Sequence, residues 1–390
     1  MGQDYKNIAI IGAGASGCFC AYHLIRAGFD ITLFDKSLAL RTLLPTGGGR
    51  CNLAHAEYDF KDLAKNYPRG EKFLYSIFSK YSTAETIATF EEMGIQCYTQ
   101  NNGRIFPDSN SAKEVRNIIL DNIRRANIIK ENVIELKPID SGFRIKTSRN
   151  SQTKNCSNEY FFTHVILALG GHSGYGLIEN LDIKVIEPRP SLVGLNTREN
   201  FKELSGTVVK KVCYNGLTDD LLFTHFGVSG PLIYTISSIK AFDKIPYKLS
   251  IDLAPDLIDL QGDLNENPHK EIKNLLSKYL PQKIVAYILR DFDSTTKAHK
   301  INGKMRDIIL NNIHNFKIEI IGTNTGEETV TAGGIDLDEI NSKTMEIKKY
   351  PNLFAIGEVL NIDGLCGGFN LQNAWSTAYV CAKGIQKSDK

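Results

Sequence analysis

The sequence predicts an α/β fold in which both ends of the chain build one parallel sheet, with a β-rich lobe and a small helical lobe inserted between them. The first observation is an apolar run over 8–11 that is followed by three glycines and a helix-like run over 18–26. The second is a late strand-like run over 352–356, followed by a helical pattern from residue 370. Between them, short alternating runs are punctuated by proline and glycine.

Three glycines, Gly12, Gly14 and Gly17, follow the first strand in the spacing GxGxxG. In a dinucleotide-binding βαβ unit the first glycine turns the chain, the second admits a pyrophosphate and the third lets the helix pack closely. The phosphates then face free N–H groups at the start of the helix, next to Ala15 and Ser16. The pattern predicts a Rossmann-like nucleotide site, and a βαβ unit without a ligand is the alternative.

A second strand, over 30–34, ends in Asp35, where the same fingerprint places a carboxylate for ribose hydroxyls. An acid there disfavours a 2′-phosphate, so the pattern predicts an FAD- or NAD-type nucleotide rather than NADP. Lys36 follows it and is included in the predicted site. No second GxGxxG follows a strand. NAD(P)H, if it is used, is therefore expected to enter the same cleft as the substrate and to reduce the flavin in turn.

The composition limits the classes of function. The length of 390 residues favours two or three lobes. The net charge of +2 argues against wholesale binding to nucleic acid or anionic membrane. A local basic excess between Lys278 and Arg306 predicts either a solvated helix face or an RNA contact. Eight cysteines without a CxxC pair predict no zinc site, redox dithiol or other metal centre. With neither a signal-peptide pattern nor a membrane-length apolar run, we expect a soluble, cytoplasmic protein.

The segment between the second strand and the middle of the chain is expected to alternate helices with short strands. An Asn-Gly turn at Asn102 and Gly103 predicts a hairpin over 98–106, and Ser111 is expected to cap the helix that follows. A polar stretch, 148–158, precedes the strand that ends in Gly170 and Gly171. Helices are expected at 71–93 and 111–126, and strands at 133–136, 143–147 and 165–169.

The C-terminal part adds a second element to the nucleotide site. The strand over 352–356 runs into Gly357 and Glu358, and the last helix begins with Asn370, Leu371 and Gln372. A strand end and a helix N-terminus can bring N–H groups and partial positive charge to the pyrimidine edge of a flavin. A crossover helix that only completes the sheet is the alternative.

Taken in order, six motifs resemble those of the HI0933-like flavoproteins over essentially the whole chain. The motifs lie at 12–17, 46–52, 103–107, 222–231, 332–335 and 357–372. The resemblance implies one FAD, a two-part Rossmann-like FAD-binding domain, an inserted β-rich lobe that carries a small helical lobe, and a cleft between lobes where the flavin meets substrate. Similar proteins include aminoacetone oxidases, bile-acid reductases and ribosomal RNA dihydrouridine synthases, so the family defines the cofactor better than the substrate.

The resemblance also assigns residues to the FAD site beyond those of the first two strands. They are Thr46, Gly47, Gly48, Arg50, Cys51, Asn52, Val133, Gly170, Gly171, Gly357, Glu358, Gly368, Phe369, Asn370, Leu371 and Gln372. The chain departs from the family pattern at Thr42, Asn361 and Cys366, and in a shortened loop over 172–176. Because the corresponding loop lies beside the flavin in the family, the shortening bears on the geometry of the active site.

Three residues are candidates for catalysis: Arg104, Tyr175 and His225. Arg104, like Arg50, offers a planar fork of donors to an anionic or carbonyl substrate, although either can be a surface arginine. Tyr175 can stack or donate a proton, or only cover the core. His225 can act as an acid or base near neutral pH or be structural. The Cys51 thiol is expected to be a packing group rather than a reactive thiolate, and Ser229 and Pro231 are expected to start a helix.

We expect an FAD-dependent oxidoreductase that transfers hydride through flavin N5. The leading hypothesis is a reductase of an electron-poor double bond that NAD(P)H supplies, and a uracil in ribosomal RNA is its most specific candidate substrate. An amine or aminoketone oxidase using O₂ and a non-catalytic flavin-binding redox protein are the alternatives. The expected domains are an FAD-binding part over 1–188 and 331–390, a β-rich part over 189–254 and 316–330, and a helical part over 255–315.

Overall fold

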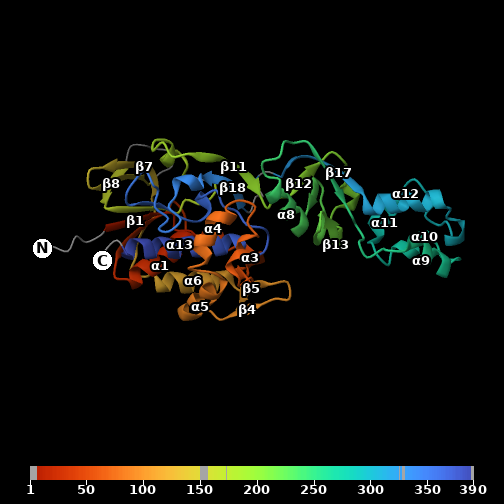
Figure 1. Ribbon diagram of the computed structural model, residues 1–390, viewed down its shortest axis with the longest axis horizontal. Coiled ribbons are helices and arrows are strands. Elements are labelled where there is room, and N and C mark those ends of the chain that lie inside the picture. Colours follow the sequence, from red (N-terminus) through yellow and green to blue (C-terminus); the bar gives the residue numbers. More distant parts are fainter. Residues whose placement is uncertain (1–6, 150–156, 173, 325, 327–329, 388–390) are drawn as a thin grey trace. The chain divides into compact units, whose positions relative to one another are not determined.

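The computed structural model describes residues 7–149, 157–172, 174–324, 326 and 330–387, and it confirms the α/β fold (Figure 1). The chain forms two compact units. Unit 1 comprises Met1–Arg189 and Val330–Lys390, and unit 2 comprises Pro190–Thr329. No helix in the described part of the chain has the length and apolar character required to span a membrane.

A five-stranded parallel sheet forms the centre of unit 1. Its order is β19-β10-β1-β2-β6, so β1 lies between β10 and β2, with Ile8 opposite His164 on one side and Ile31 on the other. Because the strand order reverses beside β1, a nucleotide in a sheet of this kind is expected outside the carboxyl ends of the strands at this point. The strands are β1 (Asn7–Ile11), β2 (Asp30–Phe34), β6 (Asn127–Ile129), β10 (His164–Leu167) and β19 (Leu353–Ala355).

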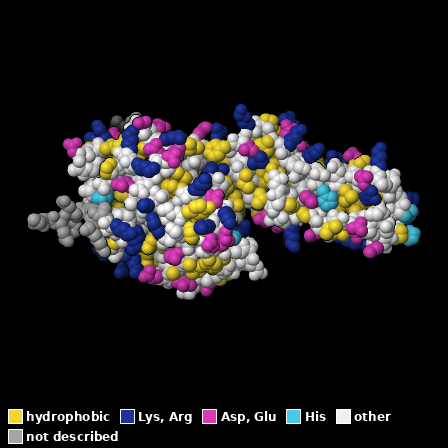
Figure 2. Space-filling view, in the orientation of Figure 1, with side chains coloured by type: hydrophobic (Ala, Val, Ile, Leu, Met, Phe, Trp, Pro, Cys, Tyr) yellow, Lys and Arg dark blue, Asp and Glu magenta, His cyan; other side chains and the backbone are white. Residues whose placement is uncertain are grey.

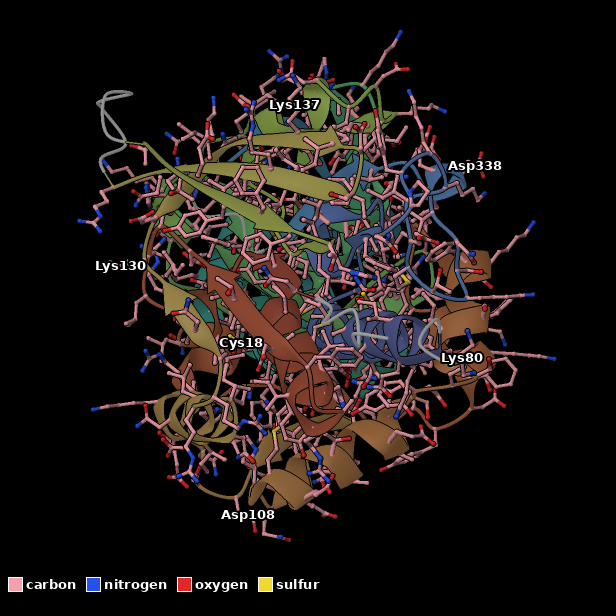
Figure 3. All side chains as sticks on the ribbon, turned by 90° about the vertical axis from the view of Figure 1, so that its left-hand side faces the viewer. Cys18, Lys80, Asp108, Lys130, Lys137 and Asp338 are labelled. Atoms are coloured by element: carbon pink, nitrogen blue, oxygen red, sulfur yellow. The ribbon has the colours of Figure 1, made fainter. Side chains whose placement is uncertain are left out.

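Two layers cover the parallel sheet (Figures 1 and 3). Helix α1 (Ala15–Arg26) packs against α13 (Phe369–Lys387) on one side, and Cys18 of α1 is fully buried there. An antiparallel meander covers the other side, where the Phe34 ring lies 5.2 Å from that of Tyr160 and 5.8 Å from that of Phe162. The meander consists of β7 (Asn132–Ile139), β8 (Gly142–Ser148) and β9 (Ser157–Phe162); residues 150–156 of the predicted polar stretch lie outside the described residues.

The helical pattern predicted over 71–93 is present as two helices, Glu71–Phe78 and Thr83–Met93. Ser82 starts a second helix through a capping box in which its backbone N–H donates to Glu85 Oε2 at 2.8 Å. The predicted hairpin is confirmed by the antiparallel pairing of residues 97–99 with 105–107. Ser111 caps the helix that follows, because its Oγ accepts from the Glu114 N–H at 3.3 Å. This region contains η1 (Arg41–Leu43), α2 (Thr46–Gly49), β3 (Ala54–His55), α3 (Phe60–Ala64), α4 (Glu71–Phe78), α5 (Thr83–Met93), β4 (Cys97–Thr99), β5 (Arg104–Pro107) and α6 (Ala112–Asn122).

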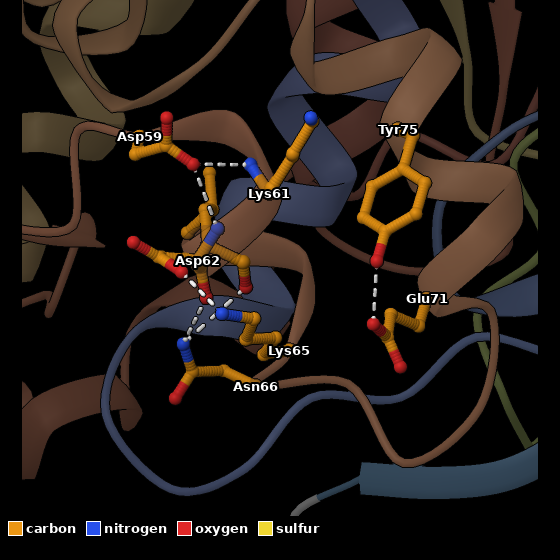
Figure 4. Close-up of polar contacts among 8 residues, drawn as sticks. Asp59, Lys61, Asp62, Lys65, Asn66, Glu71 and Tyr75 are labelled. Atoms are coloured by element: carbon orange, nitrogen blue, oxygen red, sulfur yellow. Dashed lines mark hydrogen bonds and ion pairs between the residues drawn. The ribbon is translucent and has the colours of Figure 1, made fainter.

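Local polar contacts fix helices α3 and α4 (Figure 4). Asp59 caps α3 by accepting from the backbone N–H groups of Lys61 and Asp62, at 2.8 and 3.0 Å. The following turn brings in Tyr67, whose buried hydroxyl donates to the Phe369 carbonyl at 2.6 Å. The α3–α4 region thereby positions the first residue of α13.

The chain passes between the units through a two-stranded sheet of β11 (Val185–Ser191) and β18 (Val330–Ile335). Three further short helical segments belong to the described part of unit 1. They are α7 (Gly176–Glu179), η4 (Leu337–Glu339) and η5 (Gly357–Val359).

Unit 2 is a curled antiparallel sheet of six strands, β13-β14-β15-β12-β17-β16. Its edge strands meet, because Cys213 and Asp252 exchange backbone hydrogen bonds of 2.8 and 2.9 Å. The helices share one apolar core with this sheet, which is why sheet and helices form one compact unit. The strands are β12 (Leu195–Thr197), β13 (Val208–Tyr214), β14 (Leu217–Phe223), β15 (Gly227–Ser229), β16 (Tyr247–Ile251) and β17 (Phe316–Thr323).

The expected helix start at Ser229 needs a correction. Gly230 occupies the N-cap position and Pro231 begins the helix, while Ser229 Oγ lies 3.3 Å from the Tyr234 hydroxyl oxygen. Ser229 is the last residue of β15 and lies one position before the N-cap, so the predicted N-cap at Ser229 is wrong. The helical segments of unit 2 are η2 (Lys202–Leu204), α8 (Pro231–Ile239), α9 (Leu260–Glu266), α10 (Ile272–Leu276), α11 (Gln282–Ile288), η3 (Ala298–Lys300) and α12 (Gly303–His314).

Candidate cofactor site

Four predicted segments of the site meet at one edge of the parallel sheet. Gly12 follows β1, Asp35 follows β2, Gly170 lies just beyond β10, and Gly357 lies just beyond β19. Since all these strands are parallel, their carboxyl ends lie at the same edge. This edge is therefore where a nucleotide is expected to bind.

The three glycines of the first loop have different surroundings. A Cβ added to Gly12 would lie 2.1 Å from the Ala168 carbonyl oxygen, and one added to Gly17 would lie 2.0 Å from the Gly12 carbonyl oxygen. At Gly14 the nearest atom to such a Cβ is Thr42 Oγ1, at 4.0 Å. Gly12 and Gly17 are thus required by the fold, whereas the space above Gly14 is open, as a pyrophosphate requires.

Asp35 binds the glycine loop. Its Oδ2 accepts from the Ala13 N–H at 2.8 Å, and its Oδ1 accepts from the N–H and the hydroxyl of Ser37 at 2.7 and 2.8 Å. A carboxylate has about four lone-pair positions, so capacity for a ribose hydroxyl remains. Lys36, the predicted site residue next to Asp35, is exposed. Ala15 and Ser16, which were predicted beside the phosphates, are the first residues of α1.

The loop over 46–52 contains left-handed glycines, with φ of 58° at Gly47 and 70° at Gly48. Arg50 holds the loop because its Nε donates to the Gly47 carbonyl at 3.1 Å and its guanidinium lies 4.2 Å from the centre of the Phe106 ring. Burial raises the pKa of the Cys51 thiol to about 12. Cys51 is therefore a protonated packing residue at neutral pH, in agreement with the expectation. Within the same loop, Thr46 Oγ1 donates to the Leu43 carbonyl at 2.6 Å.

Glu358 connects the ends of β10 and β19. Its Oε1 accepts from the Thr331 N–H at 2.8 Å, and a Cβ added to Gly171 would lie 2.8 Å from the same oxygen. Burial raises the pKa of Glu358. Thr331 Oγ1 also lies 2.8 Å from Nδ1 of the exposed His172. Neither His172 nor Thr331 was predicted as a site residue: His172 lies in the shortened loop over 172–176, and Thr331 directly precedes the motif over 332–335.

Tyr175 lies in the shortened loop, of which Ser173 lies outside the described residues. Its hydroxyl is buried and has no hydrogen-bond partner among the residues the structure describes. Burial, with a smaller contribution from Glu358, raises the pKa of Tyr175 to about 12. The hydroxyl is therefore protonated at neutral pH, and its hydrogen-bonding capacity is not used by the described residues.

The start of α13 is held against the rest of unit 1. A Cβ added to Gly368 would lie 2.4 Å from the Ala54 carbonyl oxygen. The Asn370 side chain accepts from the Gly364 N–H at 2.9 Å and donates to the Gly364 carbonyl at 2.8 Å. Gln372 Nε2 donates to Thr86 Oγ1 at 2.8 Å. The remaining predicted contacts of this helix are Phe369, which is buried, and Leu371, which is partly buried.

These residues fit a flavin nucleotide. In the described residues, the amide oxygens of Asn52 and Gln372 are buried without a hydrogen-bond partner. Buried polar atoms of this kind are normally satisfied, and N–H or O–H groups of a ligand can satisfy them. Together with the open space at Gly14, they leave room and partners for a dinucleotide at the edge of the sheet.

The remaining candidates are distributed over both units. In unit 1, Arg104 Nη2 donates to Cys366 Sγ at 3.6 Å. Val133, a predicted FAD contact, is a buried residue of β7 in the same unit. His225 is exposed in unit 2, on the turn between β14 and β15. Arg104 and Tyr175 thus belong to the unit that carries the nucleotide loop, and His225 does not. No group of three or more His, Cys, Asp or Glu side chains suited to a metal ion occurs among the described residues.

Comparison with known proteins identifies relatives of the whole chain. The model of the HI0933-like protein Rossmann domain matches residues 6–384. A ribosomal RNA dihydrouridine synthase of Haemophilus influenzae is 32% identical over 99% of this chain and 100% of its own length. A 3-dehydro-bile acid delta(4,6)-reductase of Clostridium scindens is 25% identical over 97% of this chain and 98% of its own.

Solved structures share the fold at low sequence identity. A 3-ketosteroid delta1-dehydrogenase from Sterolibacterium denitrificans has a TM-score of 0.52 at 12% identity, covering 99% of this chain and 100% of that one. The quinol fumarate reductase FrdA of E. coli has a TM-score of 0.51 at 13% identity, covering 98% of this chain and 70% of that one.

Proposed function

Since the chain belongs to the HI0933-like Rossmann-domain family, we propose that it is an NAD(P)H-dependent reductase of an electron-poor double bond, with a uracil of ribosomal RNA as its substrate. The chain is an FAD-dependent oxidoreductase. The observation that carries the proposed substrate is the full-length match, at 32% identity, to a relative named as a ribosomal RNA dihydrouridine synthase.

FAD, when bound, supplies the carrier that accepts and donates a hydride. The net reaction adds one hydride and one proton across the C5=C6 bond of uracil and oxidises one NAD(P)H to NAD(P)⁺. The loop at Gly14 and the N-terminus of α1 would hold the pyrophosphate. The Tyr175 hydroxyl, which is buried without a hydrogen-bond partner among the described residues, is the proposed source of the proton.

We expect NADH or NADPH to bleach the oxidised flavin within seconds when it is mixed anaerobically with the purified protein in a stopped-flow instrument. Addition of ribosomal RNA transcripts should then restore the yellow colour and increase the mass of one nucleotide by two hydrogens. Rapid reoxidation by air with release of peroxide, and no change in RNA, would instead identify an oxidase. No bleaching by either nucleotide would contradict the proposed electron donor.

The basic segment over 278–306 contains fewer free cations than its sequence indicates. Lys278 Nζ pairs with Asp263 at 2.9 Å, Arg306 Nη2 pairs with Asp307 at 2.8 Å, and Arg290 Nε lies 3.8 Å from a carboxylate oxygen of Asp291. Four exposed lysines form no ion pair with described residues: Lys283, Lys297, Lys300 and Lys304. We propose that these four lysines contact RNA phosphates.

Replacing these four lysines together by glutamine should weaken RNA binding at low salt and flatten its salt dependence. Each lost phosphate contact lowers the slope of log K against log salt by roughly 0.7 to 0.9. Filter binding over a range of salt concentrations measures this slope. A variant with the same change of charge, at Lys61, Lys65, Lys130 and Lys137 of unit 1, is the control, and equal slopes for both variants would contradict the contact.

A further inference from the structure

Two polar side chains of unit 1 lie on neighbouring strands and contact the same dipeptide. His55 of β3 is directly opposite Arg104 of β5 in an antiparallel pair, so both side chains are on one face of the sheet. His55 Nδ1 lies 3.1 Å from the Gly367 carbonyl oxygen, and Arg104 Nη2 donates to Cys366 Sγ at 3.6 Å. This dipeptide immediately precedes Gly368 and α13, the region already assigned to the FAD site.

The contact with Gly367 fixes the tautomer of His55. A carbonyl oxygen only accepts hydrogen bonds, so Nδ1 carries the proton and Nε2 of the neutral ring is an acceptor. Burial lowers the pKa of His55, with an opposing contribution from the Gly367 hydrogen bond and a further lowering by Arg104. The ring is therefore neutral near pH 7.

Packing also fixes the orientation of this ring. His55 is stacked on Phe369, with ring centres 4.6 Å apart and an interplanar angle of 26°. A Cβ added to Gly103 would lie 2.5 Å from His55 Nε2, so only glycine leaves space there. Nε2 forms no hydrogen bond with the residues that the structure describes. A rigid acceptor is thus held on the same face of the small sheet as Arg104.

We infer that His55 and Arg104 recognise the imide edge of the substrate: His55 Nε2 accepts from the ring N–H, and the Arg104 guanidinium donates to a neighbouring carbonyl oxygen. This inference rests on the proposed function, because it specifies how that site selects uracil. The N3–H of uracil lies between two carbonyl groups, whereas the N3 of cytosine has no hydrogen to donate. Sites built to hydrogen-bond a substrate group discriminate strongly against analogues that lack it.

The same pair also favours the reaction. The C4 carbonyl of uracil is conjugated with the C5=C6 bond, so addition of hydride at C6 moves negative charge towards O4. Arg104 donors directed at that oxygen would stabilise this charge. His55 is a specificity residue in this scheme, and Arg104 is a catalytic residue.

The test measures binding of uracil and of 3-methyluracil through the absorbance of bound FAD, without turnover. The wild-type protein should bind uracil at least tenfold more tightly than 3-methyluracil. His55→Phe keeps a stacked ring but removes the acceptor, so uracil binding should fall roughly tenfold, as expected for one hydrogen bond in a closed site. Binding of 3-methyluracil should change less than twofold, and His55→Gln, which retains a donor and an acceptor, should partly restore uracil binding.

Tyr98→Phe is the matched control, because it removes a surface hydroxyl from the neighbouring strand of the same small sheet. This variant should bind uracil and 3-methyluracil with the same affinities as the wild-type protein. The inference would be overturned if His55→Phe weakened the binding of uracil and of 3-methyluracil equally. It would also be overturned if the wild-type protein showed no detectable uracil binding at millimolar concentration. If uracil binds in a His55-dependent way but no RNA is reduced, the proposed function fails and the imide site remains. If RNA is reduced equally well by His55→Phe, the inference fails and the function remains.

Discussion

Gly12→Ala should destabilise the protein by about 3–5 kcal/mol, from the sum of left-handed strain and atomic overlap. Gly12 has φ of 108°, and its added Cβ would lie 2.1 Å from the Ala168 carbonyl oxygen at the end of β10. Neither the β1 loop nor the neighbouring strand can move without disturbing the centre of the parallel sheet. Urea unfolding followed by circular dichroism measures the loss.

Gly14→Ala, two residues further along, should lower stability by no more than about 1 kcal/mol, the usual cost of alanine at an N-cap, and weaken FAD binding at least tenfold. Gly14 has φ of −80°, which alanine adopts without strain, and its added Cβ would be 4.0 Å from the nearest atom. The methyl group would instead occupy the space that the pyrophosphate requires. Titration of apoprotein with FAD, followed by flavin fluorescence, measures the affinity.

Gly303→Ala is the control for both variants, because its added Cβ would also be 4.0 Å from the nearest atom but lies in unit 2. It should alter neither stability nor FAD affinity. Full FAD affinity in Gly14→Ala would show that the nucleotide does not approach this loop. The contrast between the two glycines therefore separates the structural from the ligand-binding part of the motif.

The parts of the fold that depend on local sequence were predictable. The strand over 30–34 was placed with its observed bounds, and the glycine motif lies where β1 meets α1. Both are encoded by consecutive residues, through apolar runs and through a turn that only glycine can form. The family resemblance, which rests on six motifs in order, is confirmed by the match over residues 6–384.

Other features of the site come from contacts between distant residues. His55 and Gly367 are 312 positions apart, and Thr331 and His172 are 159 apart. Neither pair has a periodicity or a spacing that sequence analysis can detect, because the chain reversals between them depend on the whole fold. The same holds for Lys278, which appeared free in the sequence and is paired with Asp263 through packing of unit 2.

Arg69→Gln should destabilise the protein by about 3–5 kcal/mol, because it removes the partner of a buried carboxylate. Asp363 is 0% exposed and Arg69 is 14% exposed, and the Nε and Nη2 of Arg69 donate to the two oxygens of Asp363. Asp363 lies in the segment that leads from η5 into α13. We therefore expect weaker retention of FAD as well as a lower urea midpoint.

Lys65→Gln is the matched control in the same part of unit 1. Lys65 pairs with Asp62 at 2.6 Å, but the two side chains are 64% and 51% exposed, so its loss should cost no more than about 1 kcal/mol. The double variant Arg69→Met with Asp363→Leu should recover part of the stability, since it leaves no charge buried. If Arg69→Gln lowers the stability of the protein no more than Lys65→Gln does, the other neighbours of Asp363 neutralise its charge. The ion pair then serves to position the segment before α13.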